Sequence, residues 1–405
     1  MTRLTAFAVM GYPVAMPSAV DAASADARPS ITSRRRRATD GTRGRLASLD
    51  GLRGVAAVVV LVHHCFLTIP ALAAPYYGNP QGAGALSWLV YSPLHLFWAG
   101  TEAVYLFFVL SGVVLGLSLR STSFSWSGYF PSRLVRLYVP VVAAVLVALV
   151  SISLVSRQPA MGSAWLNARP DGYSPAAFVA DLTLVGGVSR TVSPLWSLQW
   201  EVLFSLLLPV YVVIAARGRL VLQITAAIAL AATGAAIGSA ILTYLPMFAI
   251  GTALAARWDE VSARCERVAP ASWIVAVMAS LVGMVSYWLL LPVLPMAVTR
   301  PLSVVLALAG ITVLILAAVN FSPLRSLFAS RVLGWFGLIS FSLYLVHEPL
   351  VIASAYLFDR PLVGIAVAVP VSLGLAYVFH LLVERPAHRL SRRLRTNHLQ
   401  DLAPR

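Results

Sequence analysis

The sequence predicts an all-α integral membrane protein of about ten transmembrane helices, with both termini in the cytoplasm. Of its 405 residues, 59% are hydrophobic and only 11% are charged, whereas a soluble domain carries about 25% charged residues. The apolar residues gather in segments of about twenty, the length at which a helix crosses the hydrocarbon core of a bilayer. The chain therefore has too little polar surface for a body of this size in water.

The charges indicate how the chain is threaded through the membrane. The net charge of +15 comes from 30 arginines and 15 acidic residues, without any lysine. Most arginines stand between apolar segments. This placement indicates that they set the orientation of the chain in the membrane, and it argues against nucleic-acid binding. With the N-terminus inside, sixteen fall in inner connections and the C-terminal tail, eight in the N-terminal tail and five in outer connections. This asymmetry predicts an even number of spans in the cytoplasmic (inner) membrane.

The sequence divides into three parts. Residues 1–46 end in an arginine cluster and are predicted to be a disordered cytoplasmic tail, or an over-extended start; cleaving them as a signal peptide would export that cluster. Residues 47–388 form the membrane domain, and residues 389–405 a basic cytoplasmic tail. A short segment, Pro175–Val188, is expected to be a surface or re-entrant helix in the third connection. The ten spans are expected at Leu52–Pro70, Leu96–Leu119, Tyr138–Ser156, Leu198–Ala216, Leu220–Ser239, Ile241–Ala256, Trp273–Leu291, Leu302–Val319, Trp335–Leu357 and Leu362–Val383.

The first span, within Ser48–Leu67, carries a line of polar groups that is expensive inside a bilayer. Arg53 and His64 are eleven residues apart, so on a helix they fall within about 20° of one face and about 16 Å apart along the axis. In such a pair, Arg53 can bind an anionic ligand and His64 can accept a proton. The alternative is that Arg53 anchors the helix at the membrane interface and His64 forms a helix–helix hydrogen bond. Asp50 is expected to cap the helix, and His63 points roughly 100° away from His64.

Six motifs follow one another in a recognisable order. They are Leu49-Asp50-Gly51-Leu52-Arg53-Gly54 with His64, the segment Ala103–Gly112, Arg133-Leu-Val-Arg136 up to Pro140, Leu195–Glu201, Ser340–Pro349 and Glu384-Arg385-Pro386. Together they resemble the membrane-bound acyltransferase family 3 over about Leu49–Arg389. The resemblance implies ten spans and transfer of an acyl group, commonly acetyl from acetyl-CoA, to a hydroxyl of a sugar-containing acceptor.

The same resemblance implies roles for the first span. His64 would be the essential histidine and Arg53 the arginine of the family's R-x10-H pair. Many members have Asp where Tyr105 stands, so a carboxylate role cannot be carried over to that position. Glu102, nearly one turn earlier, is a candidate catalytic partner for His64; an interfacial acid is the alternative.

Physical chemistry suggests further roles. Acyl transfer needs a base for the acceptor hydroxyl and a donor for the oxyanion. We expect His64 to be the base and Arg53, Arg133 and Arg136 to bind CoA phosphates from the cytoplasm. Arg133 and Arg136, at i and i+3, can face one ligand; as alternatives they are ordinary inner-loop anchors.

Two further pairs are candidate acceptor or catalytic residues. Trp196 and Glu201 are expected at the outer side, at the start of the fourth span, where an aromatic ring beside a carboxylate suits a sugar. Trp196 has the alternative of an interface belt, whereas Glu201 is an acid just inside an apolar span and so a catalytic candidate. Tyr344 and His347 on the ninth span are expected to contact substrate, or else to form helix–helix hydrogen bonds.

The sequence thus predicts a membrane O-acyltransferase whose partners are acyl-CoA (acetyl-CoA or another), a sugar-containing acceptor and the bilayer, without nucleic acid or metal. Two cysteines in or beside different spans give no disulfide or metal cluster. The rival prediction is a transporter or flippase for acyl groups or lipid-linked glycans, with arginines that bind anions and a histidine that relays protons. The lack of an evident internal repeat weakens a transporter built from inverted repeats.

Overall fold

The computed structural model describes residues 31–79, 84–120, 124–157, 162–184, 187–358 and 360–400, and their side chains from residue 46 to residue 395. Contacts divide the chain into Met1–Arg43 and Gly44–Arg405, and the description below concerns the second unit. The described residues form helices and no β-strand. Residues 1–30 lie outside the described part, and the predicted boundaries after residues 46 and 388 stay predictions.

The longer helices are α1 (Ile31–Leu67), α4 (Gly100–Ser118), α5 (Trp126–Leu154), α8 (Leu195–Arg217), α9 (Leu220–Ile237), α10 (Ala240–Ala256), α12 (Pro270–Met284), α14 (Met296–Asn320), α16 (Arg331–Leu357), α17 (Pro361–Phe379) and α18 (Arg385–Gln400). The short ones are α2 (Pro70–Ala73), η1 (Ala74–Tyr77), α3 (Ala85–Tyr91), η2 (Pro93–Trp98), α6 (Ala164–Asn167), α7 (Pro175–Thr183), α11 (Trp258–Cys265), α13 (Ser286–Leu290), α15 (Ser322–Phe328) and the π-helical η3 (His380–Glu384).

Eight helices of the described residues are long and apolar enough to cross a membrane. They coincide with eight of the ten predicted spans. The predicted span Ile241–Ala256 is α10, which α11 follows at a bend of 78°. The predicted span Trp273–Leu291 corresponds to α12, a shorter apolar helix, and the separate helix α13. All-helical membrane architecture is therefore confirmed, while the count of ten and the cytoplasmic termini stay predictions.

Two helices begin earlier than the spans predicted within them. The third span was expected to begin at Tyr138, and the helix that contains it, α5, begins at Trp126, because its early polar residues find partners inside the bundle. The first helix extends back to Ile31, so Asp50 lies within α1 and does not cap it. Asp50 instead lies 3.7 Å from Arg53 in a loose ion pair.

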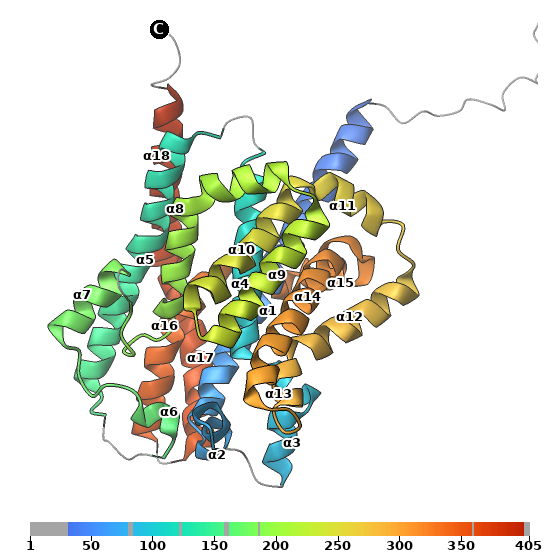
Figure 1. Ribbon diagram of the computed structural model, residues 1–405. Coiled ribbons are helices and arrows are strands. Elements are labelled where there is room, and N and C mark those ends of the chain that lie inside the picture. The colour runs from blue at the N-terminus through green and yellow to red at the C-terminus, as the bar shows by residue number, and fades with distance from the viewer. Residues whose placement is uncertain are drawn as a thin grey trace, which may run out of the picture. The chain divides into compact units, whose positions relative to one another are not determined.

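The helices pack in two groups, with α4 between them (Figure 1). On one side α4 packs against α10 and α14, α9 packs against both of these, and α12 packs against α14. On the other side α16 packs against α17 and α5, and α5 packs against α18. Helix α8 contacts α4, α5 and α10 and so joins the two groups.

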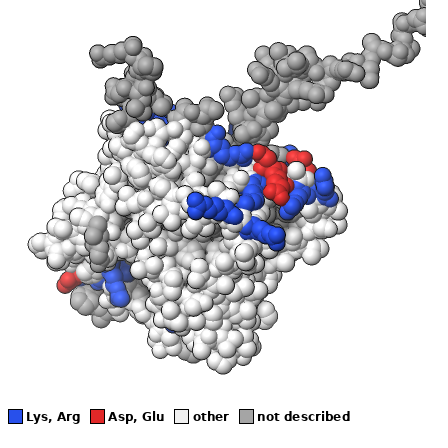
Figure 2. All heavy atoms as spheres, turned by 45° about the horizontal axis from the view of Figure 1, so that its top comes forward, with Lys and Arg blue, Asp and Glu red and all other residues white. Residues whose placement is uncertain are grey.

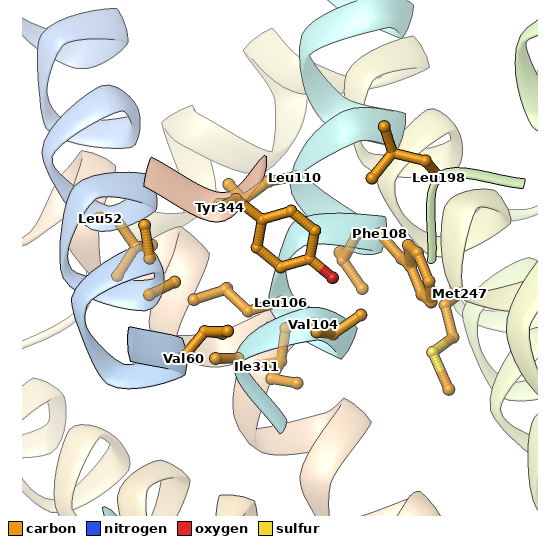
Figure 3. Close-up of a cluster of buried hydrophobic side chains, with 14 of the residues drawn as sticks. Leu52, Val60, Val104, Leu106, Phe108, Leu110, Leu198, Met247, Ile311 and Tyr344 are labelled. Atoms are coloured by element: carbon orange, nitrogen blue, oxygen red, sulfur yellow. The ribbon is translucent and has the colours of Figure 1, made fainter. Parts of the chain in front are cut away.

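Glycines bring α4 and α10 together. A Cβ atom on Gly112 or Gly251 would overlap the backbone of the other helix, the small-residue contact that lets membrane helices approach closely. Figure 3 shows the core that results, with α4 side chains such as Leu106 and Leu110 between α1 and α10. Tyr344 of α16 reaches into this core, where its hydroxyl is a polar group that needs a partner.

The surface fits a body surrounded by lipid. Figure 2 shows charged side chains gathered mainly on one end, whereas most of the remaining visible surface is uncharged. Large aliphatic side chains are exposed on several long helices, for example Val221 of α9 and Val275 of α12. In water such an exposed apolar surface would be an aggregation liability.

The predicted short segment Pro175–Val188 does contain a short helix, α7, which ends at Thr183 and packs against α5. Asp181 is fully buried here, and the Tyr173 hydroxyl donates to its carboxylate at 2.6 Å. The backbone N–H and hydroxyl of Ser189 donate to it at 2.5 Å each. Burial and the neighbouring carboxylate raise the pKa of the Tyr173 phenol. Asp181 therefore holds the connection together and does not face lipid.

Candidate active site

The first polar motif places Arg53 by close helix packing. A Cβ atom on Gly51 would overlap the backbone of Phe328, and one on Gly54 would lie 2.5 Å from the backbone nitrogen of Gly337. Only glycine lets α1 approach α15 and α16 so closely. The contact leaves Arg53, between the two glycines, half-buried at a cavity inside the bundle.

The three predicted CoA-binding arginines line this one cavity. We call it the arginine cavity; its polar lining includes Arg53, Arg133, Arg136, Glu201, Tyr344 and Glu384. They come from α1, α5, α8, α16 and η3, so segments far apart in the sequence meet here. Three guanidiniums and two carboxylates line the cavity, while the third acid near it, Asp50, is exposed and pairs only loosely with Arg53. The lining itself therefore carries more positive than negative groups.

The three arginines are not equivalent. Arg133 donates to the Glu201 carboxylate at 2.5 Å and to the Ser205 hydroxyl at 3.1 Å. Arg136, in contrast, forms no hydrogen bond or ion pair with another described residue, although it lines the cavity. The half-buried Arg136 guanidinium thus has donors that no described side chain engages, so it is the arginine best placed to take a ligand phosphate or carboxylate.

Glu201 and Arg133 were expected on opposite sides of the membrane, and the structure contradicts this separation. The Glu201 carboxylate pairs with Arg133. The reason is that α8 begins inside the bundle: the Tyr344 hydroxyl, halfway along α16, donates to the carbonyl of Pro194 at 3.2 Å. Irregular backbone at such a depth is tolerated where protein buries it. Glu201 therefore belongs to the arginine cavity and neutralises one of its charges.

Trp196 is likewise enclosed by helices. It is half-buried, and its ring packs on Tyr244 of α10 at 5.0 Å and edge-on against Phe108 of α4 at 6.1 Å. An outer interface belt would instead expose the ring to lipid headgroups. The packing therefore argues against the interface-belt alternative, and contact of Trp196 with the acceptor stays a prediction.

His64 is paired with a second histidine. Its Nδ1 lies 2.7 Å from Nε2 of His347 on α16. Nδ1 of His347 lies 2.8 Å from the carbonyl oxygen of Leu343, so this nitrogen carries the hydrogen. In neutral rings Nε2 of His347 is then the acceptor and Nδ1 of His64 the donor. Nε2 of His64 is left with a free lone pair, the feature that a general base needs.

Glu102 does not take the place expected for it. The partner of His64 is His347. Glu102 instead lines a second cavity, separate from the arginine cavity, and His64 is not among its lining residues. Nδ1 of His63 donates to the carbonyl of Trp98 at 2.9 Å, and the His63 ring lies edge-on to that of His64, closer than the predicted divergence of the two side chains suggested. The prediction of a Glu102–His64 contact is therefore wrong; Tyr105 lines the same second cavity as Glu102.

Residues that sequence reasoning missed enclose the histidine pair. Trp165 of α6 stacks on His64 with ring centroids 5.4 Å apart, and the Arg169 guanidinium lies 4.5 Å from the centre of the Trp165 ring. Arg169 forms a buried ion pair of 3.0 Å with Glu348, which also accepts from the backbone and hydroxyl of Ser193 at 2.5 Å each.

Only one of these residues had a usable sequence signal. Glu348 follows His347 inside an apolar span, where an acid usually has a function or a partner. Trp165 and Arg169 stand in the third connection, where interface aromatics and arginines are common. Arg169 also retains a buried Nε–H without a partner in the described part of the chain.

Tyr344 links the arginine cavity to the histidine pair. Its hydroxyl lies 2.7 Å from the hydroxyl of Ser197, and its ring lies 6.2 Å from that of His347, one turn further along α16. Tyr344 thus stands between the arginine cavity, which it lines, and the histidine pair. Among the described side chains, no group of three His, Cys, Asp or Glu residues is arranged to hold a metal ion.

Comparison with known families decides what this arrangement belongs to. The profile of the acyltransferase domain family matches residues 46–381. The chain belongs to the acyltransferase 3 family. Each predicted site residue of this acyltransferase-family chain, from Arg53 to His347, lies within the matched segment. The resemblance that the six sequence motifs carried is therefore confirmed.

One relative supports the same family. Acyltransferase MdmB of Streptomyces mycarofaciens is 29% identical over 168 residues, which cover 41% of this chain and 39% of that protein. The match therefore spans about two fifths of the relative's length. No solved structure matches this acyltransferase-family chain.

Proposed function

We propose that this chain is an integral membrane O-acyltransferase. It transfers an acyl group, acetyl in the first instance, from acyl-CoA to a hydroxyl of a carbohydrate or glycosylated acceptor. The observation that carries the proposal is the His64–His347 pair, whose hydrogen bonds leave a lone pair on Nε2 of His64. Membership of an acyltransferase family supports the reaction class.

The histidine pair suits a direct transfer. The acceptor O–H bond breaks as its proton moves to Nε2 of His64, and the oxygen bonds to the thioester carbonyl carbon. The C–S bond then breaks, and His64 returns the proton to the sulfur of the leaving CoA. His347 keeps His64 in the required tautomer and accepts its Nδ1–H while the ring is charged. The unpaired Nε–H of Arg169 is a donor available for the oxyanion at this site.

The arginine cavity suits the donor. A CoA molecule carries several phosphate charges, which a surplus of guanidinium groups binds through charge-assisted hydrogen bonds. In this proposal Arg136 and Arg53 bind phosphate, while Arg133 is held by Glu201 and positions the cavity wall. The donor enters from the cytoplasm, and the protein resides in the cytoplasmic membrane, as the arginine asymmetry indicates.

The test is covalent transfer. Membranes that contain the protein are given acetyl-CoA with a labelled acetyl group and an acceptor fraction, namely the glycolipids and glycosides extracted from cells that lack the gene. Labelled acetyl ester on a glycan, seen by mass spectrometry as one added acetyl mass, supports the proposal. Movement of unchanged label or glycan across sealed vesicles, without ester formation, would instead establish the transporter or flippase.

A further inference from the structure

A second cavity lies beyond the His63 end of α1. We call it the aromatic cavity; its lining includes Glu102, Tyr105, Tyr244, Tyr287, Trp288 and Arg300. Its volume of about 380 Å³ falls in the range of about 300–1,000 Å³ that is usual for small-molecule sites. The arginine cavity, at about 60 Å³, is much smaller. The two cavities have no lining residue in common.

An unsatisfied carboxylate oxygen points to a ligand here. Glu102 is 4% exposed, and its Oε2 has no hydrogen-bond partner in the described part of the chain. Burying a carboxylate oxygen without a partner is costly. The N-terminus of α4, where Glu102 is the third residue, offsets part of that cost. A bound hydroxyl group would supply the missing donor.

The rest of the lining selects the ligand class. The lining holds one carboxylate, Glu102, and one guanidinium, Arg300, whose charges balance. A polyanion such as CoA would therefore bind better in the arginine cavity. A hydrocarbon tail would leave the buried Oε2 of Glu102 without a donor, and two other cavities are lined almost entirely by apolar side chains. Aromatic faces combined with polar groups suit a ring that has apolar C–H faces and hydroxyls at its edge.

A single side chain, that of Tyr76, lies between the aromatic cavity and the histidines His63 and His95. Tyr76 lines it, and the Tyr76 hydroxyl lies 3.0 Å from Nε2 of His95 and 3.4 Å from Nδ1 of His63. Burial lowers the pKa of His95 to about 2, so this ring is neutral, and its Nδ1–H donates to the carbonyl of Val90 at 3.0 Å. Nε2 of His95 therefore accepts from the Tyr76 hydroxyl and orients the Tyr76 ring at the edge of the cavity. Beyond Tyr76, the His63 and His64 rings are 5.2 Å apart.

We propose that the aromatic cavity binds a hydroxylated sugar ring of the acceptor, with Glu102 and Arg300 as its hydrogen-bonding groups. This inference rests on the proposed acyl transfer and assigns the second substrate a site separate from the donor's. The bound ring is a recognition element: it anchors a larger glycan or glycoside whose reacting hydroxyl lies at His64. Binding energy from such a remote group can be used to position the reacting one.

The test measures separately the amount of acceptor fraction and the concentration of acetyl-CoA at which transfer is half-maximal. Labelled transfer is measured while either acetyl-CoA or the extracted acceptor fraction is varied, for the wild type, Glu102→Gln and Arg300→Gln. We expect each variant to raise the half-saturating amount of acceptor fraction about tenfold, the effect of one lost charge-assisted hydrogen bond. The KM for acetyl-CoA should stay within about twofold, because the donor cavity is untouched. Half-saturation does not depend on how much variant protein is inserted.

Tyr211→Phe is the matched control. Its hydroxyl donates to the carbonyl of Leu245 at 3.0 Å, and the residue lines one of the apolar cavities, so neither half-saturation should change. Separate aqueous and chloroform–methanol acceptor fractions show whether the ring belongs to a soluble glycoside or to a lipid-linked glycan.

The outcomes separate the two proposals. Unchanged acceptor half-saturation in both variants, or an effect on acetyl-CoA alone, would overturn the sugar site while leaving acyl transfer intact. Absence of transfer by the wild type would instead refute the acyltransferase proposal, and the acceptor site with it.

Discussion

The arginine cavity and the aromatic cavity differ in charge, width and lining. The first is smaller in volume and is lined by three guanidiniums and two carboxylates, whereas the second is larger and is lined by one of each among aromatic rings. Tyr344 connects the first to the histidine pair, and Tyr76 with His63 separates the second from it. The difference teaches that one bundle offers two chemically distinct environments near a single base. We interpret them as donor and acceptor sites.

The largest expected effect lies between the two cavities, at His64. His64→Ala removes the general base, so kcat for labelled acetyl transfer should fall about 10³-fold. Both half-saturating concentrations should stay near the wild-type values, because neither cavity loses a lining group. Western blotting of washed membranes controls for insertion. Normal turnover of an inserted His64→Ala protein would remove His64 from the chemistry.

A smaller effect is expected at His347, which acts through His64 as a positioning residue. His347→Ala leaves Nδ1 of His64 without its acceptor, so the ring can adopt the wrong tautomer, and kcat should fall about 100-fold. His347→Gln, whose amide oxygen can still accept a hydrogen bond, should recover about tenfold of that loss. Equal losses in the two variants would show that the residue only fills space.

The smallest effect distinguishes arginines within one cavity. Arg136→Gln removes an unpaired guanidinium, so we expect the KM for acetyl-CoA to rise about tenfold with the acceptor half-saturation unchanged. Arg133→Gln should instead reduce the amount of inserted protein, because it leaves the Glu201 carboxylate without its partner, at a cost of about 3–5 kcal/mol.

The double variant Arg133→Gln/Glu201→Gln is the control for that distinction. It removes both charges of the pair, so the amount of inserted protein should recover much of the loss. Failure of the double variant to recover would mean that Arg133 has a role beyond its ion pair. An unchanged KM in Arg136→Gln would contradict the donor assignment of the arginine cavity.

Local patterns in the sequence were sufficient to predict the helical membrane architecture and to place Arg53 and His64 on one face of a helix. Apolar segments of membrane-spanning length predicted the helices, because backbone hydrogen bonds have to be satisfied within each segment in lipid. Helical periodicity placed Arg53 and His64 on one face of α1, and the glycines beside Arg53 mark its close packing. Six ordered motifs identified the family, and the family profile confirms it.

Pairings between distant segments were decided only by the tertiary structure. The pairing of Glu201 with Arg133 was not expected, because sequence gives no sign that α8 begins inside the bundle, where Tyr344 contacts Pro194. His347, the partner of His64, is 283 residues away in the sequence. Glu102 was chosen as the partner only because it stands nearly one turn before Tyr105, where many family members have Asp. Hydropathy and periodicity describe one helix at a time, whereas buried charges are neutralised by whichever side chain the packing brings within reach.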